Sequence, residues 1–201
     1  MTNCDCNIEI KNGDERRILL TLLCINALMF VVEITLGIFS ESTALIADSL
    51  DMLADATVYG IGLYAVGRSP LLKIKAARTS GLFQIVLGLC VLFDVLRRLI
   101  WGSEPESSLM MSIGILALIA NTICLILISK HKDGEIHMRA SWIFSKNDVI
   151  ANIGIIISGG LVYLLDSRFP DLIIGMLISI IVVRGGMSII KDADNEKQSL
   201  P

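Results

Sequence analysis

Three aspartates, Asp48, Asp51 and Asp55, follow one another at spacings of three and four residues within a mostly apolar stretch. On an α-helix these spacings place the three side chains within an arc of ~60°. A carboxylate at bilayer depth costs ~2.5–3.5 kcal/mol even on lenient insertion scales, so three together need a cation, a proton or water as compensation. Because carboxylate oxygens suit divalent cations, the pair Asp51 and Asp55 is a candidate metal site.

Further candidate ligands and proton carriers lie in other apolar stretches. Asp148 and Asn152 are one helical turn apart, so their oxygens could complete a shell that the first pair begins. Asp48 could be a third ligand, a proton carrier or the partner of a cation on another helix. Glu33 could line the pathway or form an interhelical hydrogen bond.

Each of these assignments has a plainer alternative. The paired carboxylates could be balanced by a cation from another segment, Lys146 or Arg184. Asn147 and Asp148 could lie at the polar end of a helix that still touches water. Asp94, a single charge in its own apolar stretch, could instead form a local ion pair with a basic residue four positions on, Arg98.

Two short polar motifs could gather metal outside the apolar stretches. Cys4 and Cys6 could pass on a soft metal, although a disordered tail is the simpler interpretation. His131 and His137 flank two acidic residues, and a solvated polar loop is the simpler interpretation there.

The elements that must position these residues are transmembrane helices. Of the 201 residues 54% are hydrophobic, and the mean hydropathy is +0.71, as is typical of polytopic membrane proteins. The net charge of −3 gives no indication of nucleic-acid binding. The sequence therefore predicts an all-α membrane protein with six transmembrane helices. The predicted spans are roughly residues 18–39, 44–67, 80–100, 108–129, 138–165 and 171–190.

The charges between the spans predict their orientation. Basic residues gather in the N-terminal segment and in the connections 68–78 and 130–139. The positive-inside rule therefore places both termini and these connections in the cytoplasm. The opposite connections carry the acidic residues Glu104, Glu106, Asp166 and Asp171. The predicted organisation is a cytoplasmic N-terminal tail at 1–17, a six-helix transporter domain at 18–190 and a short cytoplasmic tail at 191–201.

A long motif crosses the first two spans. It reads Glu33-x-x-x-Gly37-x-x-Ser40-x-Ser42-x-Ala44-Leu45-x-x-Asp48-Ser49-x-Asp51-x-x-x-Asp55. This motif, the six spans and the second carboxylate helix resemble the cation diffusion facilitators, which are proton-coupled exporters of divalent metals. The resemblance covers about residues 18–190, and the part in the fifth span is the less specific.

The resemblance implies a transport site made from a ligand pair in span two and another in span five. Asp51 and Asp55 match the first pair, and Asp148 matches the second member of the other. Its first member, usually histidine or aspartate, falls on Phe144, which cannot bind a metal. The candidates to replace the missing ligand are Asn147, Asn152, Asp48 and water.

The resemblance also implies the activity and partners. We expect a transporter, not an enzyme, that exports a divalent cation from the cytoplasm in exchange for protons. Zn²⁺ is the first choice, with Co²⁺, Cd²⁺, Mn²⁺ and Fe²⁺ as others, and no cofactor is expected to be permanently bound. We expect a multi-pass homodimer in a bacterial inner membrane, in a short form without the family's cytoplasmic C-terminal domain. The alternatives are a transporter linked to protons or Na⁺, and a non-transporting protein that keeps the fold.

Overall fold

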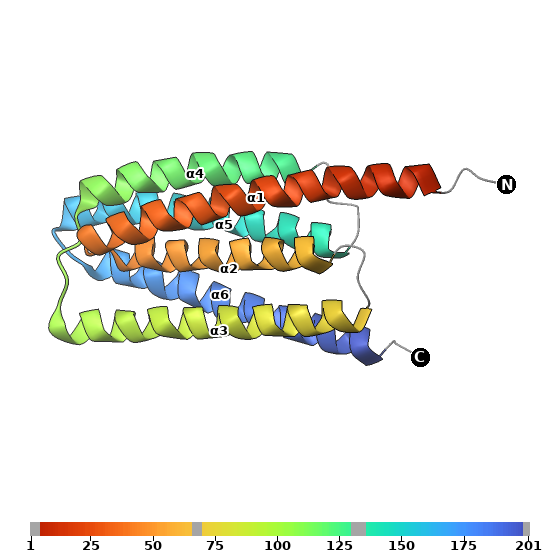
Figure 1. The fold of residues 1–201 in the computed structure, drawn as a ribbon. Coiled ribbons are helices and arrows are strands. Elements are labelled where there is room, and N and C mark those ends of the chain that lie inside the picture. Colours follow the sequence, from red (N-terminus) through yellow and green to blue (C-terminus); the bar gives the residue numbers. More distant parts are fainter. Residues whose placement is uncertain (1–4, 66–69, 130–135, 199–201) are drawn as a thin grey trace.

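The computed structural model describes residues 5–65, 70–129 and 136–198, and these residues fold into a bundle of six helices without strands. The elongated helices run roughly along one axis, so the first residues of α1 and the last of α6 lie at the same end (Figure 1). The predicted all-α fold is confirmed. The helices are α1 (Asp5–Phe39), α2 (Thr43–Ala65), α3 (Pro70–Trp101), α4 (Ser107–Ser129), α5 (Ile136–Leu165) and α6 (Phe169–Gln198).

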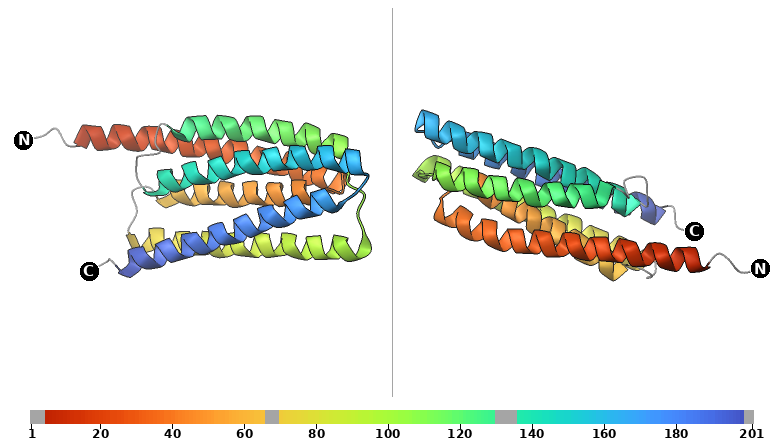
Figure 2. Two further views of the ribbon diagram at one scale, coloured as in Figure 1. Left: turned by 180° about the vertical axis from the view of Figure 1, so that it is seen from behind. Right: turned by 90° about the horizontal axis from the view of Figure 1, so that it is seen from above.

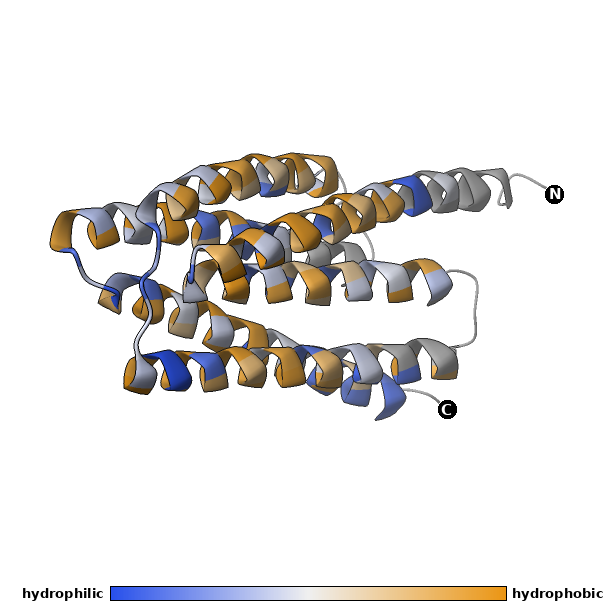
Figure 3. Cartoon of the chain, turned by 60° about the vertical axis from the view of Figure 1, so that its left-hand side comes forward, coloured by the Kyte–Doolittle hydropathy of each residue, from blue (hydrophilic) through white to orange (hydrophobic). Residues whose placement is uncertain are grey.

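Five of the helices contain segments long and apolar enough to cross a membrane, as expected for a polytopic membrane protein. Apolar residues dominate these helices, and hydrophilic residues lie mainly toward their ends (Figure 3). The remaining helix, α2, has 23 residues and so spans about 35 Å, but its three aspartates break the apolar pattern. It contacts each of the five other helices, which together shield it. The five segments are Arg16–Phe39, Ala77–Trp101, Ser107–Ser129, Ser145–Leu165 and Phe169–Gln198.

Three helices extend well beyond the predicted spans: α3, which begins at Pro70, and also α1 and α6. Helix α1 begins at Asp5, so most of the segment predicted as an N-terminal tail is helical and projects beyond the bundle (Figure 1). Helix α6 continues to Gln198, past the predicted end of its span. Both extensions are polar, and a helix satisfies its own backbone hydrogen bonds, so it need not end where the apolar residues do.

The helices associate mainly in pairs. The most extensive contacts join α3 to α6, α1 to α2 and α4 to α5. The α3–α6 pair lies along one side of the bundle in both Figure 1 and Figure 2, and α2 connects it to the other helices. The interior is therefore bounded by α2, α5 and the α3–α6 pair.

A buried aspartate of α6 caps the beginning of α2. Asp171, which the sequence analysis placed in an external connection, is fully buried. Its carboxylate accepts hydrogen bonds from the Ser42 hydroxyl at 2.6 Å and from the backbone N–H groups of Thr43 and Ala44 at 2.6 and 3.1 Å. The Ser42 hydroxyl in turn accepts a bond from the Leu45 N–H. The first free N–H groups of α2 thus receive acceptors, one of them from the far end of the chain.

We predict that Asp171→Asn destabilises the bundle. The new amide would direct an N–H at donors that now share two carboxylate oxygens, so the expected loss is about 1–2 kcal/mol. Thermal unfolding in detergent measures it, with Asp166→Asn, an exposed aspartate just before α6, as the matched control. Equal stability of the two variants would contradict the role of Asp171 as a cap.

Glycines let the backbones of α3 and α6 touch. A methyl group added at Gly186 would lie 2.6 Å from the Gly81 carbonyl oxygen, and one added at Gly81 would lie 2.7 Å from the Gly186 oxygen. Two turns further along α3, the Ser179 hydroxyl donates a 2.6 Å hydrogen bond to the carbonyl of Gly88. Small residues thus replace side-chain packing with backbone contact, as in other membrane helix pairs.

We predict that Gly186→Ala separates α3 from α6 and lowers thermal stability. Its methyl group would meet backbone, which cannot move aside like a flexible side chain, and such overpacking costs about 1–3 kcal/mol. Gly160→Ala is the control because no neighbouring atom lies within 4 Å of its added methyl group. That variant should be as stable as the parent or slightly more so. If the two alanine variants unfold at the same temperature, the close contact between α3 and α6 is contradicted.

Candidate metal site

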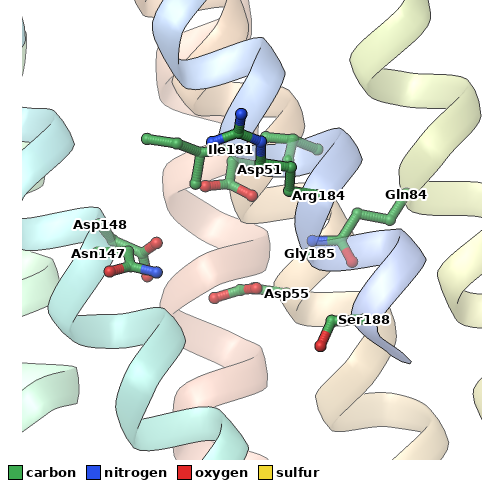
Figure 4. Close-up of a pocket in the computed structure, with 10 residues that line it drawn as sticks. Asp51, Asp55, Gln84, Asn147, Asp148, Ile181, Arg184, Gly185 and Ser188 are labelled. Carbon is green, nitrogen blue, oxygen red and sulfur yellow. The ribbon is translucent and has the colours of Figure 1, made fainter. Parts of the chain in front are cut away.

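A pocket of about 320 Å³ opens between α2, α3, α5 and α6 (Figure 4). Its deeper wall is formed by buried polar side chains, and its outer part by exposed residues of α6, Arg184 and Ser188. The lining residues are Asp51, Asp55, Gln84, Asn147, Asp148, Ile181, Val182, Arg184, Gly185 and Ser188.

The three carboxylates expected to bind metal all line this pocket. Asp51 and Asp55 come from neighbouring turns of α2, and Asp148 comes from α5. The side chains of Asp55 and Asp148 are 3% and 8% exposed, and their carboxyl groups interact directly across the α2–α5 contact. Figure 4 shows all three carboxylates directed into the same space. Two separate segments therefore bring acidic oxygens together, as a shared cation would require.

Asp55 is held by a neighbour on its own helix. The Tyr59 hydroxyl, one turn further along α2, donates a 3.3 Å hydrogen bond to Oδ2 of Asp55. The Tyr59 ring is buried against Leu19, Leu22 and Cys124, so it cannot easily turn away.

Asp48 and Glu33, two of the accessory candidates, lie outside the pocket. Both are buried, and Glu33 of α1 lies against Asp48. Neither oxygen of Glu33, nor Oδ2 of Asp48, has a hydrogen-bond partner among the described residues. The shared face of α2 is thus divided: Asp48 faces α1, while Asp51 and Asp55 face the pocket.

The two asparagines of α5 differ in the same way. Asn147 lines the pocket beside Asp148. Asn152 does not; it is fully buried, and its Nδ2 donates a 2.7 Å hydrogen bond to the backbone carbonyl of Asp148. Although Asn152 lies one turn of α5 from Asp148, its amide nitrogen bonds to the helix backbone, and the side chain does not line the pocket.

The structure also distinguishes the two cations considered as partners of the paired carboxylates. Arg184 lines the pocket, and its guanidinium lies on the Asp51 side (Figure 4). Lys146 is exposed, with its ammonium 5.9 Å from the centre of the Trp142 ring. Arg184 is therefore the pocket cation, and Lys146 belongs to the surface of α5.

Asp94 forms the local ion pair that its spacing suggested. Its Oδ2 lies 2.6 Å from Nε of Arg98, and its Oδ1 lies 2.6 Å from Nη2 of Arg97. Arg98 also donates to the backbone carbonyl of Glu41, next to the turn between α1 and α2. Asp94 thus stabilises the end of α3 and lies outside the pocket.

The pocket is not a closed three-ligand site. Across the described part of the chain, no three His, Cys, Asp or Glu side chains gather closely enough to hold a metal ion by themselves. A bound ion would need water or neutral oxygens as well. The candidates Cys4 and His131 lie outside the described residues, as do the side chains of Cys6, His137 and Phe144.

Two further lining residues carry polar groups that sequence reasoning did not select. Gln84 is a single amide in the apolar run of α3, and Ser188 follows a glycine pair near the polar end of α6. Gln84 has no acidic residue, histidine or cysteine at helical spacing, and Ser188 has only Asp192, four residues further along α6. Their place in the pocket depends on the α3–α6 contact.

Comparison with known proteins agrees with this geometry. The family model for the cation efflux transmembrane domain matches residues 19–194, nearly the whole chain. This chain is a cation diffusion facilitator. The family assignment expected from the motif across the first two spans is confirmed, and a facilitator of this kind is an integral, multi-pass membrane transporter.

Several curated relatives of this facilitator are named for metal transport. The vacuolar zinc transporter ZRC1 of Saccharomyces cerevisiae is 34% identical over 139 residues, which cover 62% of this chain and 31% of the relative. The zinc transporter ZitB of Escherichia coli is 25% identical over 201 residues, 94% of this chain and 64% of the relative. The metal cation efflux system protein CzcD of Cupriavidus metallidurans is 23% identical over 195 residues, 91% and 62% respectively. The chain spans less than two thirds of the length of each relative.

Proposed function

We propose that this facilitator exports a divalent metal cation from the cytoplasm in exchange for protons, and binds it with Asp51, Asp55 and Asp148. The observation that carries the proposal is the convergence of these three carboxylates, from α2 and α5, on one pocket in a membrane bundle. Such a concentration of negative charge in lipid calls for a cation. Membership of the cation efflux family supports the same conclusion.

Zn²⁺ is the first candidate for the cargo. Carboxylate oxygens bind it at about 2.0–2.2 Å, and a site open at one side can complete its coordination with water. Two of the relatives, ZRC1 and ZitB, are named as zinc transporters, and CzcD as a metal cation efflux protein. Co²⁺, Cd²⁺, Mn²⁺ and Fe²⁺ are the other cargoes to test, since oxygen ligands accept each of them.

Competition for the same oxygens would couple metal to protons. A metal ion binds ionised carboxylates, so loading releases protons, and protonation from the far side displaces the metal. The pocket lies where the α3–α6 pair meets α2 and α5, and relative movement of these groups would change the side from which it is reached. We place the basic connections and both ends of the chain in the cytoplasm, and propose a homodimer in a bacterial plasma membrane.

A non-transporting protein is the second candidate. Arg184 lines the pocket and offers the carboxylates a permanent cation, and no three-ligand metal cluster forms within the described ranges. In that case the guanidinium would be a structural counter-ion, and the pocket would have no cargo.

We predict that Asp51→Ala and Asp55→Ala each abolish transport while the protein still inserts and folds. Each change removes a pocket carboxylate and leaves the helix intact, so Zn²⁺ uptake into proteoliposomes under a pH gradient should fall to the level of empty vesicles. Glu104→Ala is the control, since this exposed glutamate lies in the connection between α3 and α4, outside the pocket. Undiminished flux in both pocket variants would refute the proposed site.

We predict that Arg184→Gln tightens metal binding if the pocket carries a cation. A unit charge next to a bound dication opposes it by at least about 1 kcal/mol, so the dissociation constant for Zn²⁺ should fall about fivefold or more. Calorimetric titration measures this, with Lys146→Gln as the matched control because Lys146 lies over Trp142. If Arg184→Gln instead destabilises a protein that binds no metal, the non-transporting alternative is the better account.

A further inference from the structure

The amide of Gln84 is a buried polar group that the proposed carboxylate site does not use. The side chain is only 2% exposed, it lines the pocket, and its Oε1 has no hydrogen-bond partner within the described residues. Burying a carbonyl oxygen without a partner costs about 1–3 kcal/mol, so native structures rarely retain one without a reason. An unpartnered oxygen in a pocket lined by three carboxylates indicates a cation as its missing partner.

The fold directs this side chain toward the pocket. Gly81 and Gly88 flank Gln84 by three and four residues on the same face of α3, and both bring the α3 backbone against α6. This close approach lets the Gln84 side chain extend from α3 to Gly185 of α6, at the edge of the pocket (Figure 4). Larger residues at those two positions would hold α3 away from α6 and withdraw the amide from the pocket.

Other neutral oxygens fit the vacant ligand position less well. Asn152 is turned away from the pocket, where its amide donates to the backbone of Asp148. Asn147 is the residue before Asp148, so it adds an oxygen on a side that α5 already supplies. Gln84 comes from α3, across the pocket from α5, and would give the ion a ligand from a third helix.

We propose that Oε1 of Gln84 is a further ligand of the transported cation and supplies the donor that Phe144 lacks. This inference rests on the proposed function, because it needs an ion among Asp51, Asp55 and Asp148. The resulting donor set contains only oxygen, from carboxylates, an amide and water. Such a set suits divalent cations that accept hard ligands, and it discriminates weakly between Zn²⁺ and Mn²⁺.

Direct ligation is tested with Co²⁺ and the variant Gln84→Cys. A thiolate bound to Co²⁺ gives an intense charge-transfer absorption, which appears in the difference spectrum against the parent protein only if position 84 touches the metal. Asn121→Cys is the matched control, because Asn121 is also a buried amide with no hydrogen-bond partner in the described part of the chain, but it lies outside the pocket. We expect the band for Gln84→Cys alone, and expect it to disappear when Asp55→Ala is added.

Affinity and stability give a second, independent test with Gln84→Leu and Gln84→Glu. Leucine removes the oxygen, so Co²⁺ affinity should fall about 10- to 100-fold, while the metal-free protein unfolds at the same or a higher temperature. Glutamate keeps an oxygen and adds charge, so affinity should be equal or higher. A merely structural amide would instead lower stability in both variants and leave affinity unchanged.

The failure of this inference is distinguishable from failure of the proposed function. Absence of the band in Gln84→Cys, with parental Co²⁺ affinity in Gln84→Leu, overturns the role of Gln84. If Asp55→Ala abolishes Co²⁺ binding in the same assay, the carboxylate site stands without it. If Asp55→Ala also binds Co²⁺ normally, the proposed site itself is wrong.

Discussion

The arrangement of this bundle depends on keeping the acidic groups of α2 away from lipid. A helix with Asp48, Asp51 and Asp55 cannot face hydrocarbon, so the other five helices must enclose it. Enclosure places each carboxylate either against another helix or in a pocket. Asp48 lies against Glu33 of α1, and Asp51 and Asp55 line the pocket. The same constraint that makes α2 costly to insert therefore creates the space in which a cation could be held.

Holding α2 in place requires contacts that themselves consist of polar groups and small residues. Asp171 fixes the beginning of the helix, because its carboxylate collects donors that would otherwise be unpaired in an apolar setting. On the other side, Gly81 and Gly186 bring α3 and α6 together without intervening side chains. The first contact lies at the beginning of the helix that carries Asp51 and Asp55, and the second lies beside Gly185, a lining residue of the pocket. The position of the pocket walls is thus set by contacts to the backbone more than by the packing of large side chains.

The sequence pattern was enough to predict features that are determined within a single helix. The lengths of the apolar runs gave the six helices, and helical spacing put Asp51 and Asp55 on one face of α2, where both line the pocket. Helical spacing was too coarse for Asp48, because an arc of ~60° spans the boundary between two neighbouring helices. It also failed for Asp171 and Gln84, whose environments are made by segments distant in sequence. Sixteen glycines gave no sign of which of them would face another backbone.

The charges lining the pocket suggest why an arginine accompanies three aspartates. With Asp51, Asp55 and Asp148 ionised and Arg184 protonated, the pocket carries two net negative charges, which one divalent cation neutralises. A monovalent ion would leave one negative charge uncompensated, and a trivalent ion would leave one positive charge in excess. In either case the electrostatic free-energy cost grows as water is excluded from the pocket. A neutral ligand such as the Gln84 amide adds coordination without altering this balance. A carboxylate in its place would bind a dication at least as tightly, but the loaded pocket would then keep one uncompensated negative charge.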